Sequence, residues 1–377
     1  MMPDQELDTT SPPEIGEEQL ALLERLCNAC AVSGDEGEVR KIVLEEVRPY
    51  AEQVTVDALG NVLVSKTGQG ERTPRKSSAG QARLRVMLAA HMDEVGFMLT
   101  GDDEDGIFRF DTVGGLDAAQ LIGKPVCIGK EHVPGVIGAR PIHLATREEL
   151  SQKISLESLR IDVGPGNGGK ARIGDRATFA TQFARLGPSL RAKALDDRFG
   201  VASLITLVQH TPPNIDLLAA FTVQEEVGLR GARVAAYTFD PQVAFALDCT
   251  PANDLPPWDT DEGRIENARY NTRLGAGPAI YLADSSTLSD PRLARHLVQT
   301  AEALGLPYQL RQPGGGGTDA GAIHKQRLGI PSISLSVPGR YLHTAAAIAR
   351  LDDWKNTFAL IYHALSRLSP DLFALER

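Results

Sequence analysis

Continuous apolar runs separated by amphipathic segments constrain the fold of this chain more than any other feature. LRVMLAA at 84–90 is a continuous apolar run typical of a strand that is covered on both faces. Further strands are predicted for LLAAFTV at 217–223, VAFALD at 243–248 and SISLSV at 332–337. Helical spacing of apolar residues is found near 198–210, 232–237, 293–305 and 353–368. Strands that alternate with helices favour a parallel sheet. We therefore expect an α/β fold with a mostly parallel central sheet flanked by helices.

The region from about 95 to 182 has a different character. Short Val- and Ile-rich pieces are separated there by Gly, Pro and Asp every ten residues or so, which predicts a small all-β domain inserted into the α/β domain. The predicted organisation is a polar N-terminal tail at 1–18, an α/β domain built from 19–94 and 183–377, and the β domain at 95–182.

Charge and hydropathy exclude several classes of partner. The 49 acidic residues outnumber the 39 Lys and Arg, giving a formal net charge of -10, and no basic run is present. We therefore expect no binding to nucleic acid or to anionic membranes. No apolar run is long enough to span a bilayer. The acidic N-terminus lacks the apolar core of a secretory signal, so a cytoplasmic location is expected.

The cysteines are too few and too scattered for a disulfide framework. They are Cys27, Cys30, Cys127 and Cys249. Cys27 and Cys30 form a C-x-x-C inside the helical pattern LALLERLCNACAV, and no strand leads into it as a thioredoxin-like motif requires. Both are predicted to be buried helix thiols.

Acidic residues and histidines stand where buried strands are predicted to end. Five segments share this setting: His91-Met92-Asp93, Asp196-Asp197, Glu225-Glu226, Asp248 and His343. Imidazoles and carboxylates are suitable ligands for divalent zinc, cobalt or manganese. Because an open α/β sheet places its active site at strand ends, the pattern predicts a metal site at this edge.

Two of these segments have ordinary explanations when each is taken alone. Alternation along an extended chain places His91 and Asp93 on the same side, where a carboxylate can hold the second nitrogen of a metal-bound imidazole. An H-x-D also arises by chance, and a satisfied histidine is the commoner case. Asp196 and Asp197 precede a predicted helix, and two aspartates there make a normal N-cap.

The other segments are harder to explain without a site. Glu225 and Glu226 point to opposite sides of an extended chain, so one can bind metal while the other faces the substrate. An ionised Asp248 at the end of an apolar run needs a cation or hydrogen bonds. The Gly-rich stretch at 313–323 lacks the Gly-Lys-Ser/Thr ending of a phosphate loop and is predicted to be a flexible turn near the substrate. No role is assigned to the other histidines, which are His132, His143, His210, His296, His324 and His363.

The order of these pieces resembles the tetrahedral dinuclear metallo-aminopeptidases, the group that includes glutamyl, leucyl and deblocking aminopeptidases of bacteria and archaea. The matching motifs are AAHMDEVGFM, GVIGARPIHL, RIGDRATF, KALDDRFG, FTVQEEVGLRGA, ALDCT, GGTDAGAI and PGRYLHT. They cover about 20–365 in the order of the family, which is far more specific than any one motif.

The resemblance implies two divalent metal ions per subunit, zinc, cobalt or manganese. Their ligands would be His91 and Asp248 for one ion, Glu226 and His343 for the other, and Asp196 as the bridge. Glu225 would be the general base, and Asp93 would orient His91. The β domain would be the dimerisation domain, and dimers would assemble into a homo-oligomer of twelve subunits, a dodecamer, around a chamber.

The chain departs from the family in three places. The family's His-Ser/Thr-Pro-x-Glu is here His343-Thr344-Ala345-Ala346-Ala347, so the support of the His343 ligand differs. The loop at 68–82 and the N-terminal tail are also longer than expected.

The predicted activity is removal of N-terminal residues from peptides with a free N-terminus. A metal-activated water would lose its proton to Glu225, which then protonates the leaving amine. The alternatives are an N-acyl deacylase or another metal-dependent amidohydrolase, and a catalytically silent assembly scaffold. A glycosidase is disfavoured, because adjacent glutamates cannot flank one glycosidic bond. Arg273 and Arg340 are candidate cations for recognising an acidic side chain.

Overall fold

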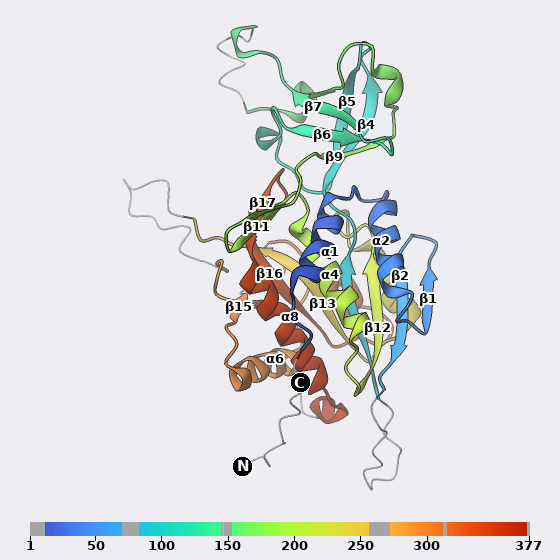
Figure 1. Cartoon of the computed structure of the whole chain (residues 1–377), viewed down its shortest axis with the longest axis vertical. Coiled ribbons are helices and arrows are strands. Elements are labelled where there is room, and N and C mark those ends of the chain that lie inside the picture. Colours follow the sequence, from blue (N-terminus) through green and yellow to red (C-terminus); the bar gives the residue numbers. More distant parts are fainter. Residues whose placement is uncertain are drawn as a thin grey trace.

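A computed structural model of the chain describes residues 12–69, 83–144, 146, 153–255, 272–311 and 315–374. An α/β part forms the larger body, and a small β barrel stands at one end of it (Figure 1). Most of the predicted N-terminal tail, most of the 68–82 loop and the first residues of the Gly-rich stretch lie outside the described residues.

Four parallel strands form the centre of the main sheet, as the apolar runs predict. In spatial order they are β12 (Ile215–Thr222), β3 (Leu84–His91), β13 (Val243–Pro251) and β16 (Ser332–Arg340). Register places Thr222 beside His91 at the ends of β12 and β3. The polar residues that follow these strands therefore meet at one edge of the sheet.

Antiparallel strands extend the sheet on both sides. On one side lie β2 (Val62–Thr67) and β1 (Gln53–Val56); on the other lie β17 (Ala347–Arg350), β11 (Ser189–Ala192) and β10 (Ala184–Leu186). A short branch beside β16 consists of β14 (Ala279–Tyr281) and β15 (Gln309–Arg311).

Helices cover both faces of the sheet. One core includes residues of α1 (Glu17–Asn28), α2 (Gly37–Val47), α4 (Leu195–Gln209), α6 (Pro291–Leu304) and α8 (Leu351–Ser366), and the other includes residues of α5 (Arg230–Phe239) and α7 (Ala320–Ile323). Successive residues of β3 alternate between the cores, since Val86 and Leu88 face the first while Met87 and Ala89 face the second. This double coverage explains why β3, β12 and β13 are mostly continuous apolar runs.

Six short strands between residues 96 and 179 close into a barrel. Around it run β4 (Gly96–Asp102), β5 (Ile107–Val113), β8 (Arg160–Asp162), β7 (Val133–Gly138), β6 (Pro125–Ile128) and β9 (Arg176–Phe179). Phe97 packs edge-to-face on Phe110 and Phe179, with ring centroids 5.2 and 5.3 Å apart. The barrel thus has a core of its own.

A buried ion pair joins the barrel to the α/β part. Glu94 lies between β3 and β4 and accepts a hydrogen bond from Thr178 of β9 at 2.9 Å. Lys193 donates to both oxygens of Glu94 at 2.6 Å, and the backbone N–H of Ala31 donates to Oε1 at 2.9 Å. Both oxygens of Glu94 therefore accept hydrogen bonds, as a buried carboxylate requires.

The helix prediction for the C-x-x-C pair is correct for only one of its cysteines. Cys27 is buried in α1, but α1 ends at Asn28. Cys30 therefore lies in the link between α1 and α2, where it is only partly buried. The prediction of a helix beyond Asn28 was wrong, because Ala31 and Val32 are buried in an extended segment rather than on a helix. In this segment Val32 forms a β-bridge with Glu94.

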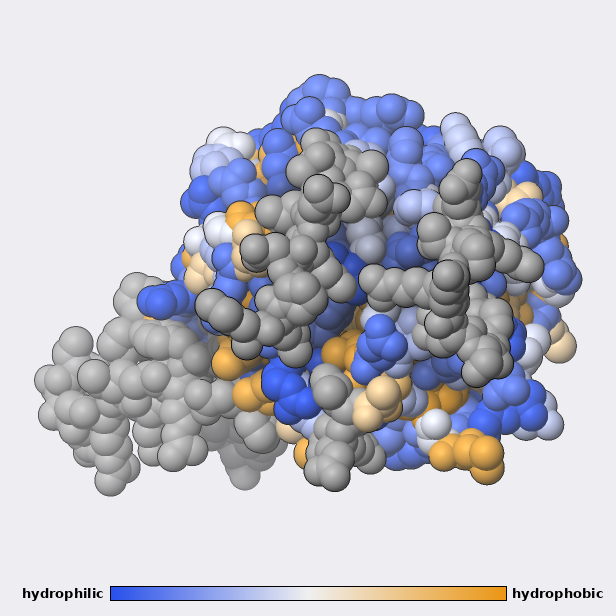
Figure 2. All heavy atoms as spheres, turned by 90° about the horizontal axis from the view of Figure 1, so that it is seen from below, coloured by the Kyte–Doolittle hydropathy of each residue, from blue (hydrophilic) through white to orange (hydrophobic). Residues whose placement is uncertain are grey.

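The outer surface is mainly polar. Figure 2 shows small, separate apolar patches among hydrophilic side chains on the face of the molecule away from the barrel. Among the described residues, none of the helices combines the length and the apolar composition that crossing a membrane requires.

Candidate metal centre

The structure brings all seven predicted site residues to the carboxyl edge of the four parallel strands. His91 is the last residue of β3, Asp248 lies in the second half of β13, and Asp196 opens α4. Glu225 and Glu226 lie shortly after the end of β12, and His343 lies shortly after the end of β16. Asp93 is two residues after His91. Six of the seven line a cavity of about 670 Å³, and Asp93 lies behind them, fully buried.

Asp196 lies between two imidazoles. Its Oδ1 is 3.2 Å from Nε2 of His91, and its Oδ2 is 3.5 Å from Nε2 of His343. Asp196 and Asp197 depart from helical backbone angles, and the peptide bond between them is cis. Each oxygen of one carboxylate thus faces a different histidine, which is the arrangement that a bridging ligand requires.

A further carboxylate accompanies each imidazole. Asp248 Oδ1 lies 3.8 Å from Nε2 of His91, and Glu226 Oε2 lies 3.3 Å from Nε2 of His343. No ion pair connects a Lys or Arg to the acids of this cluster within the described part of the chain. Among the described residues, no Lys or Arg therefore neutralises these carboxylates by direct pairing.

Asp93 does more than its predicted role of orienting His91. Its Oδ1 is 3.6 Å from Nδ1 of His91, whereas its backbone carbonyl is 3.1 Å from that nitrogen. The carboxylate instead accepts the backbone N–H groups of Glu225 at 2.9 Å and Glu226 at 3.2 Å, and the hydroxyl of Ser33 at 2.6 Å. Asp93 therefore fixes the turn that carries both glutamates.

The imidazole of His343 is supported from the barrel side. Its Nδ1 lies 3.1 Å from the carbonyl oxygen of Gly115, two residues after the end of β5. The altered segment after His343 closes on itself, since Thr344 donates to the carbonyl of Tyr341 at 2.7 Å. A backbone carbonyl can hold the second nitrogen of a metal-bound histidine as a carboxylate does.

The electrostatics of the cluster favour positive charge at its centre. Burial, reinforced by neighbouring charges, raises the pKa of Asp248 and of Glu225 well above the ordinary carboxyl values. Burial opposes protonation of the histidines, but the carboxylates beside them raise the pKa of His91 well above its usual range and that of His343 to about 11. The pKa of Asp196 is lowered despite its burial, because both imidazoles donate to it.

Two buried acids of the site were not assigned from the sequence. Asp319 accepts a hydrogen bond from Thr222 at 2.5 Å through Oδ2, while Oδ1 has no hydrogen-bond partner. Burial raises the pKa of Asp319 to about 6. Asp197 holds the N–H of Gly200 at 2.9 Å through Oδ1, and its Oδ2 is likewise unpaired. The motifs GGTDAGAI and KALDDRFG contained both residues, but nothing in the sequence distinguished them from ordinary helix caps.

The residues present fit divalent metal. One ligand atom each from His91, Asp196 and Glu226 lies within 4.8 Å of the other two, and the same holds for His91, Asp197 and Asp248. Ligands held at about 2.0–2.2 Å by tetrahedral zinc are separated by about 3.3–3.6 Å. The observed separations of 3.2 to 3.8 Å between imidazole nitrogens and carboxylate oxygens match this spacing.

Comparison with known proteins identifies the family. Residues 74–360 match the profile of the peptidase family described as M42 glutamyl aminopeptidase. The chain belongs to this family. It is an aminopeptidase, and M42 peptidases depend on metal, in keeping with the acid and histidine groups described above. The predicted family, fold class and enzyme class are therefore confirmed, and the deacylase and scaffold alternatives lose their support.

Relatives of this M42 chain cover nearly its whole length. A lysyl aminopeptidase from Pyrococcus furiosus is 32% identical over 362 residues, which are 93% of this chain and 97% of the relative. The structure of an aminopeptidase from Desulfurococcus kamchatkensis has a TM-score of 0.84 and 30% identity, covering 94% of this chain and 96% of that one. The TET1 peptidase of Pyrococcus horikoshii, which can assemble into a tetrahedron or a large octahedral shell, has a TM-score of 0.77 and 32% identity, covering 93% and 100%.

Proposed function

We propose that this M42 aminopeptidase removes the N-terminal residue of peptides in the cavity at the strand ends, with Glu225 as its general base and two divalent ions as cofactors. The observation that supports this most strongly is the position of Asp196, with one carboxylate oxygen beside each imidazole. A protein that used these histidines only for packing would not need an acid between them.

The five ligands proposed from the sequence divide into two sets around Asp196. One set is His91 with Asp248 and the other is His343 with Glu226. When bound, two divalent ions would lower the pKa of a water molecule and polarise the scissile carbonyl. Zinc, cobalt and manganese all suit these ligands.

Glu225 has the position and the proton affinity that a general base needs. It lines the cavity next to a ligand position, and its backbone N–H is held by Asp93 at 2.9 Å. Burial raises its pKa well above the usual range, which increases its ability to take a proton near neutral pH. We propose that Glu225 takes a proton from the attacking water and transfers it to the amine that leaves.

A cation in the cavity wall favours acidic N-terminal side chains. Arg311 of β15 is the one Lys or Arg among the described residues that line the cavity, and it is only 5% exposed. Its guanidinium lies 4.3 Å from the ring centroid of Tyr281 and donates to Thr250 and to the carbonyl of Gly315. None of these partners is a carboxylate, so the charge is available to an acidic substrate.

The two cations suggested by the sequence do not have this setting. Arg340 is paired with Asp254, with N···O distances of 2.6 and 2.8 Å. Arg273 has an exposed side chain and does not line the cavity.

We also propose that the barrel is the dimerisation domain and that dimers assemble further, in the predicted case into a dodecamer. Large assemblies of the TET1 relative support this. Apolar side chains on the barrel are exposed, with Ile122 at 41%, Val136 at 40% and Ile173 at 63%. A neighbouring subunit that packs on the barrel would cover such side chains.

The test is a comparison of substrates on metal-stripped and metal-reloaded protein. Reloading with zinc, cobalt or manganese should restore hydrolysis of aminoacyl substrates and leave the same compounds with an acetylated amine uncleaved. Cleavage of the acetylated compounds, or full activity without metal, would contradict the proposal. Native mass spectrometry of the same samples measures the number of subunits.

A further inference from the structure

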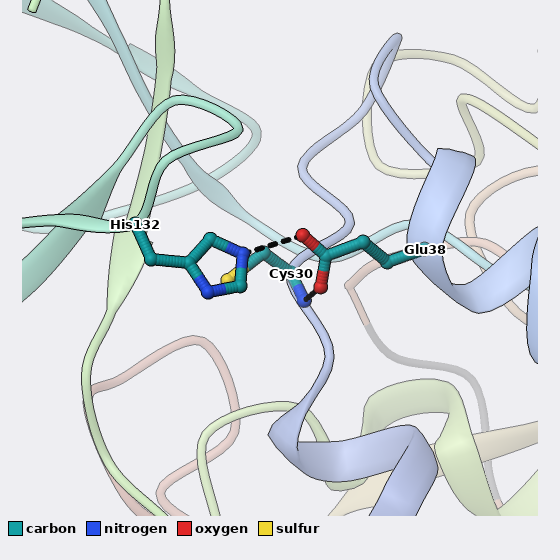
Figure 3. Close-up of side chains that lie close together, drawn as sticks. All are labelled: Cys30, Glu38 and His132. Carbon is teal, nitrogen blue, oxygen red and sulfur yellow. Dashed lines mark hydrogen bonds and ion pairs between the residues drawn. The ribbon is translucent and has the colours of Figure 1, made fainter.

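A second group of metal-ligand side chains lies between the barrel and the α/β part. Cys30 stands in the link after α1, Glu38 is the second residue of α2, and His132 ends the turn between β6 and β7 (Figure 3). Cys30 and Glu38 are eight residues apart, but His132 lies 94 residues after Glu38, so only the fold brings its imidazole to the other two.

Glu38 holds the group together. Its Oε1 lies 2.5 Å from Nε2 of His132, and its Oε2 accepts the backbone N–H of Cys30 at 2.9 Å. One ligand atom from each of the three side chains, a sulfur, a carboxylate oxygen and an imidazole nitrogen, lies within 4.8 Å of the other two. In Figure 3 the imidazole and the sulfur point toward the same side of the carboxylate.

We propose that Cys30, Glu38 and His132 form a zinc site that links the barrel to the α/β part, separate from the catalytic centre. Thiolate, imidazole and carboxylate are the three ligand types that zinc binds in proteins. Ligands of a tetrahedral zinc ion stand about 3.3–3.8 Å apart, so the three side chains need only small rotations to reach that spacing.

A candidate fourth ligand lies near the group, although its sulfur is not among the ligand atoms that lie within 4.8 Å of one another. Cys127 of β6 lines a cavity of about 410 Å³ together with Cys30 and Glu38. It belongs to the same hairpin as His132, whose turn runs from β6 into β7. The site would therefore take two ligands from the barrel and two from the α/β part, or three protein ligands and a water.

Basic side chains also line this cavity, but two of them are bound elsewhere. Arg40 donates to the carbonyl of Gly60 at 3.0 Å, and Arg176 donates to the carbonyl of Gly174 at 3.0 Å. Their guanidiniums are thus held by backbone oxygens. The contact between Glu38 and His132 is half exposed, and exposed pairs of this kind contribute little by themselves.

The first test measures metal content. Metal-stripped protein is reloaded with excess zinc, freed of loosely bound metal, and analysed by mass spectrometry of the elements. Cys30→Ser and His132→Asn should each hold about one zinc ion per chain fewer than the wild type. Asn is chosen at 132 because it tolerates the left-handed backbone there, with φ of 50°.

The second test uses cobalt, whose bonds to sulfur give a near-ultraviolet charge-transfer absorption. The proposed catalytic ligands are nitrogen and oxygen, so this absorption reports a thiolate site. Cys249 is the necessary control, because its sulfur lies near Asp196 and Asp197. The absorption should persist in Cys249→Ser and should weaken in Cys30→Ser, or disappear there if Cys127 is not a ligand.

Two results would overturn the inference. One is equal zinc content in the wild type and in both variants, which would make the group an ordinary ion pair beside a thiol. The other is a cobalt spectrum of the wild type without sulfur absorption. Neither result depends on peptidase activity, so failure here leaves the proposed function intact.

Discussion

The two groups of metal-ligand side chains in this chain differ in burial and in ligand chemistry. At the proposed catalytic centre the side chains of His91 and Asp248 are 3% and 8% exposed, although that of His343 is 40% exposed. The side chains of His132 and Glu38 are 45% and 40% exposed. Both groups contain a contact between an imidazole and a carboxylate. The buried group has an excess of carboxylates, and the half-exposed group has one carboxylate and a thiol.

This difference suggests a chemical role for the first group and a structural role for the second. Excess carboxylates excluded from water have shifted pKa values and can exchange protons with a substrate. A thiol, an imidazole and one carboxylate that connect two parts of a chain are suited to holding those parts together. The excess of buried carboxylates, rather than the presence of metal ligands, is therefore the feature that supports a catalytic role for the first group.

The largest expected effect comes from Glu225→Gln. The amide cannot take a proton, so kcat should fall by about 10²- to 10⁴-fold while metal content stays at the wild-type level. Glu226→Gln is the matched control: it should lose bound metal, and part of its activity should return as metal is added. Normal turnover in Glu225→Gln would show that Glu225 is not the general base. The proposed difference in role between the two groups would then lose its main support.

A smaller loss is expected from Asp93→Asn. The amide cannot accept from Ser33, Glu225 and Glu226 together, so the turn with both glutamates loosens, and metal affinity or kcat/KM should fall by about 10- to 100-fold. Ser33→Ala removes one of the three donors and should cost less. Metal titration followed by steady-state kinetics measures both; equal effects of the two variants would refute the positioning role.

Next in size is a change in substrate preference. Replacing Arg311 with Met removes its charge from the cavity wall and should lower kcat/KM for a glutamyl substrate about 10-fold or more relative to a leucyl substrate. The ratio of the two substrates is the measurement, because a general disturbance of the cavity would lower both. An unchanged ratio would show that Arg311 does not contribute to recognition of the acidic side chain of the substrate.

The smallest effect concerns the stability of metal-free protein. The pKa of Asp319 rises from an ordinary 3.8 to about 6, so the folded state keeps a proton that the unfolded chain releases. The stabilisation from this proton is complete at pH values below the ordinary carboxyl pKa of 3.8, and it is lost as the pH rises through about 6. Asp248 and Glu225 shift in the same direction. The lowered pKa of Asp196 changes the stability only at pH values below the ordinary carboxyl range.

We therefore expect the Tm of metal-free protein to fall by a few degrees between about pH 4.5 and about pH 7. With metal bound the fall should be smaller, because the cations stabilise the ionised carboxylates. Calorimetry with and without metal decides this. A Tm that rises over the same range in the metal-free protein would contradict the assigned shifts.

Local patterns in the sequence predicted these elements well, because β3, β12 and β13 are mostly apolar on both faces and helices such as α5 and α6 have a regular apolar stripe. The meeting of His91, Asp196, Glu226, Asp248 and His343 followed from strand ends and from the family resemblance. The role of Asp93 toward the glutamates did not follow, since that contact crosses 132 residues.

The Cys30 group shows where sequence reasoning stops. His132 lies in a turn rather than at the end of a buried strand, and Cys30 continued a helical pattern that the chain leaves at Asn28. Only the packing of the hairpin against α2 brings the imidazole to Glu38. A site made by two packed surfaces leaves no spacing signal along the chain.

The carbonyl of Gly115 would give the barrel a part in the proposed catalysis. It holds a ligand of the proposed second ion from outside the body that contains all the others. A neighbour that tilted the barrel by a small angle would turn the ring of His343 with it. If the barrel forms the proposed contact between subunits, this one backbone oxygen would couple the packing of the subunits to the rate of hydrolysis in each of them.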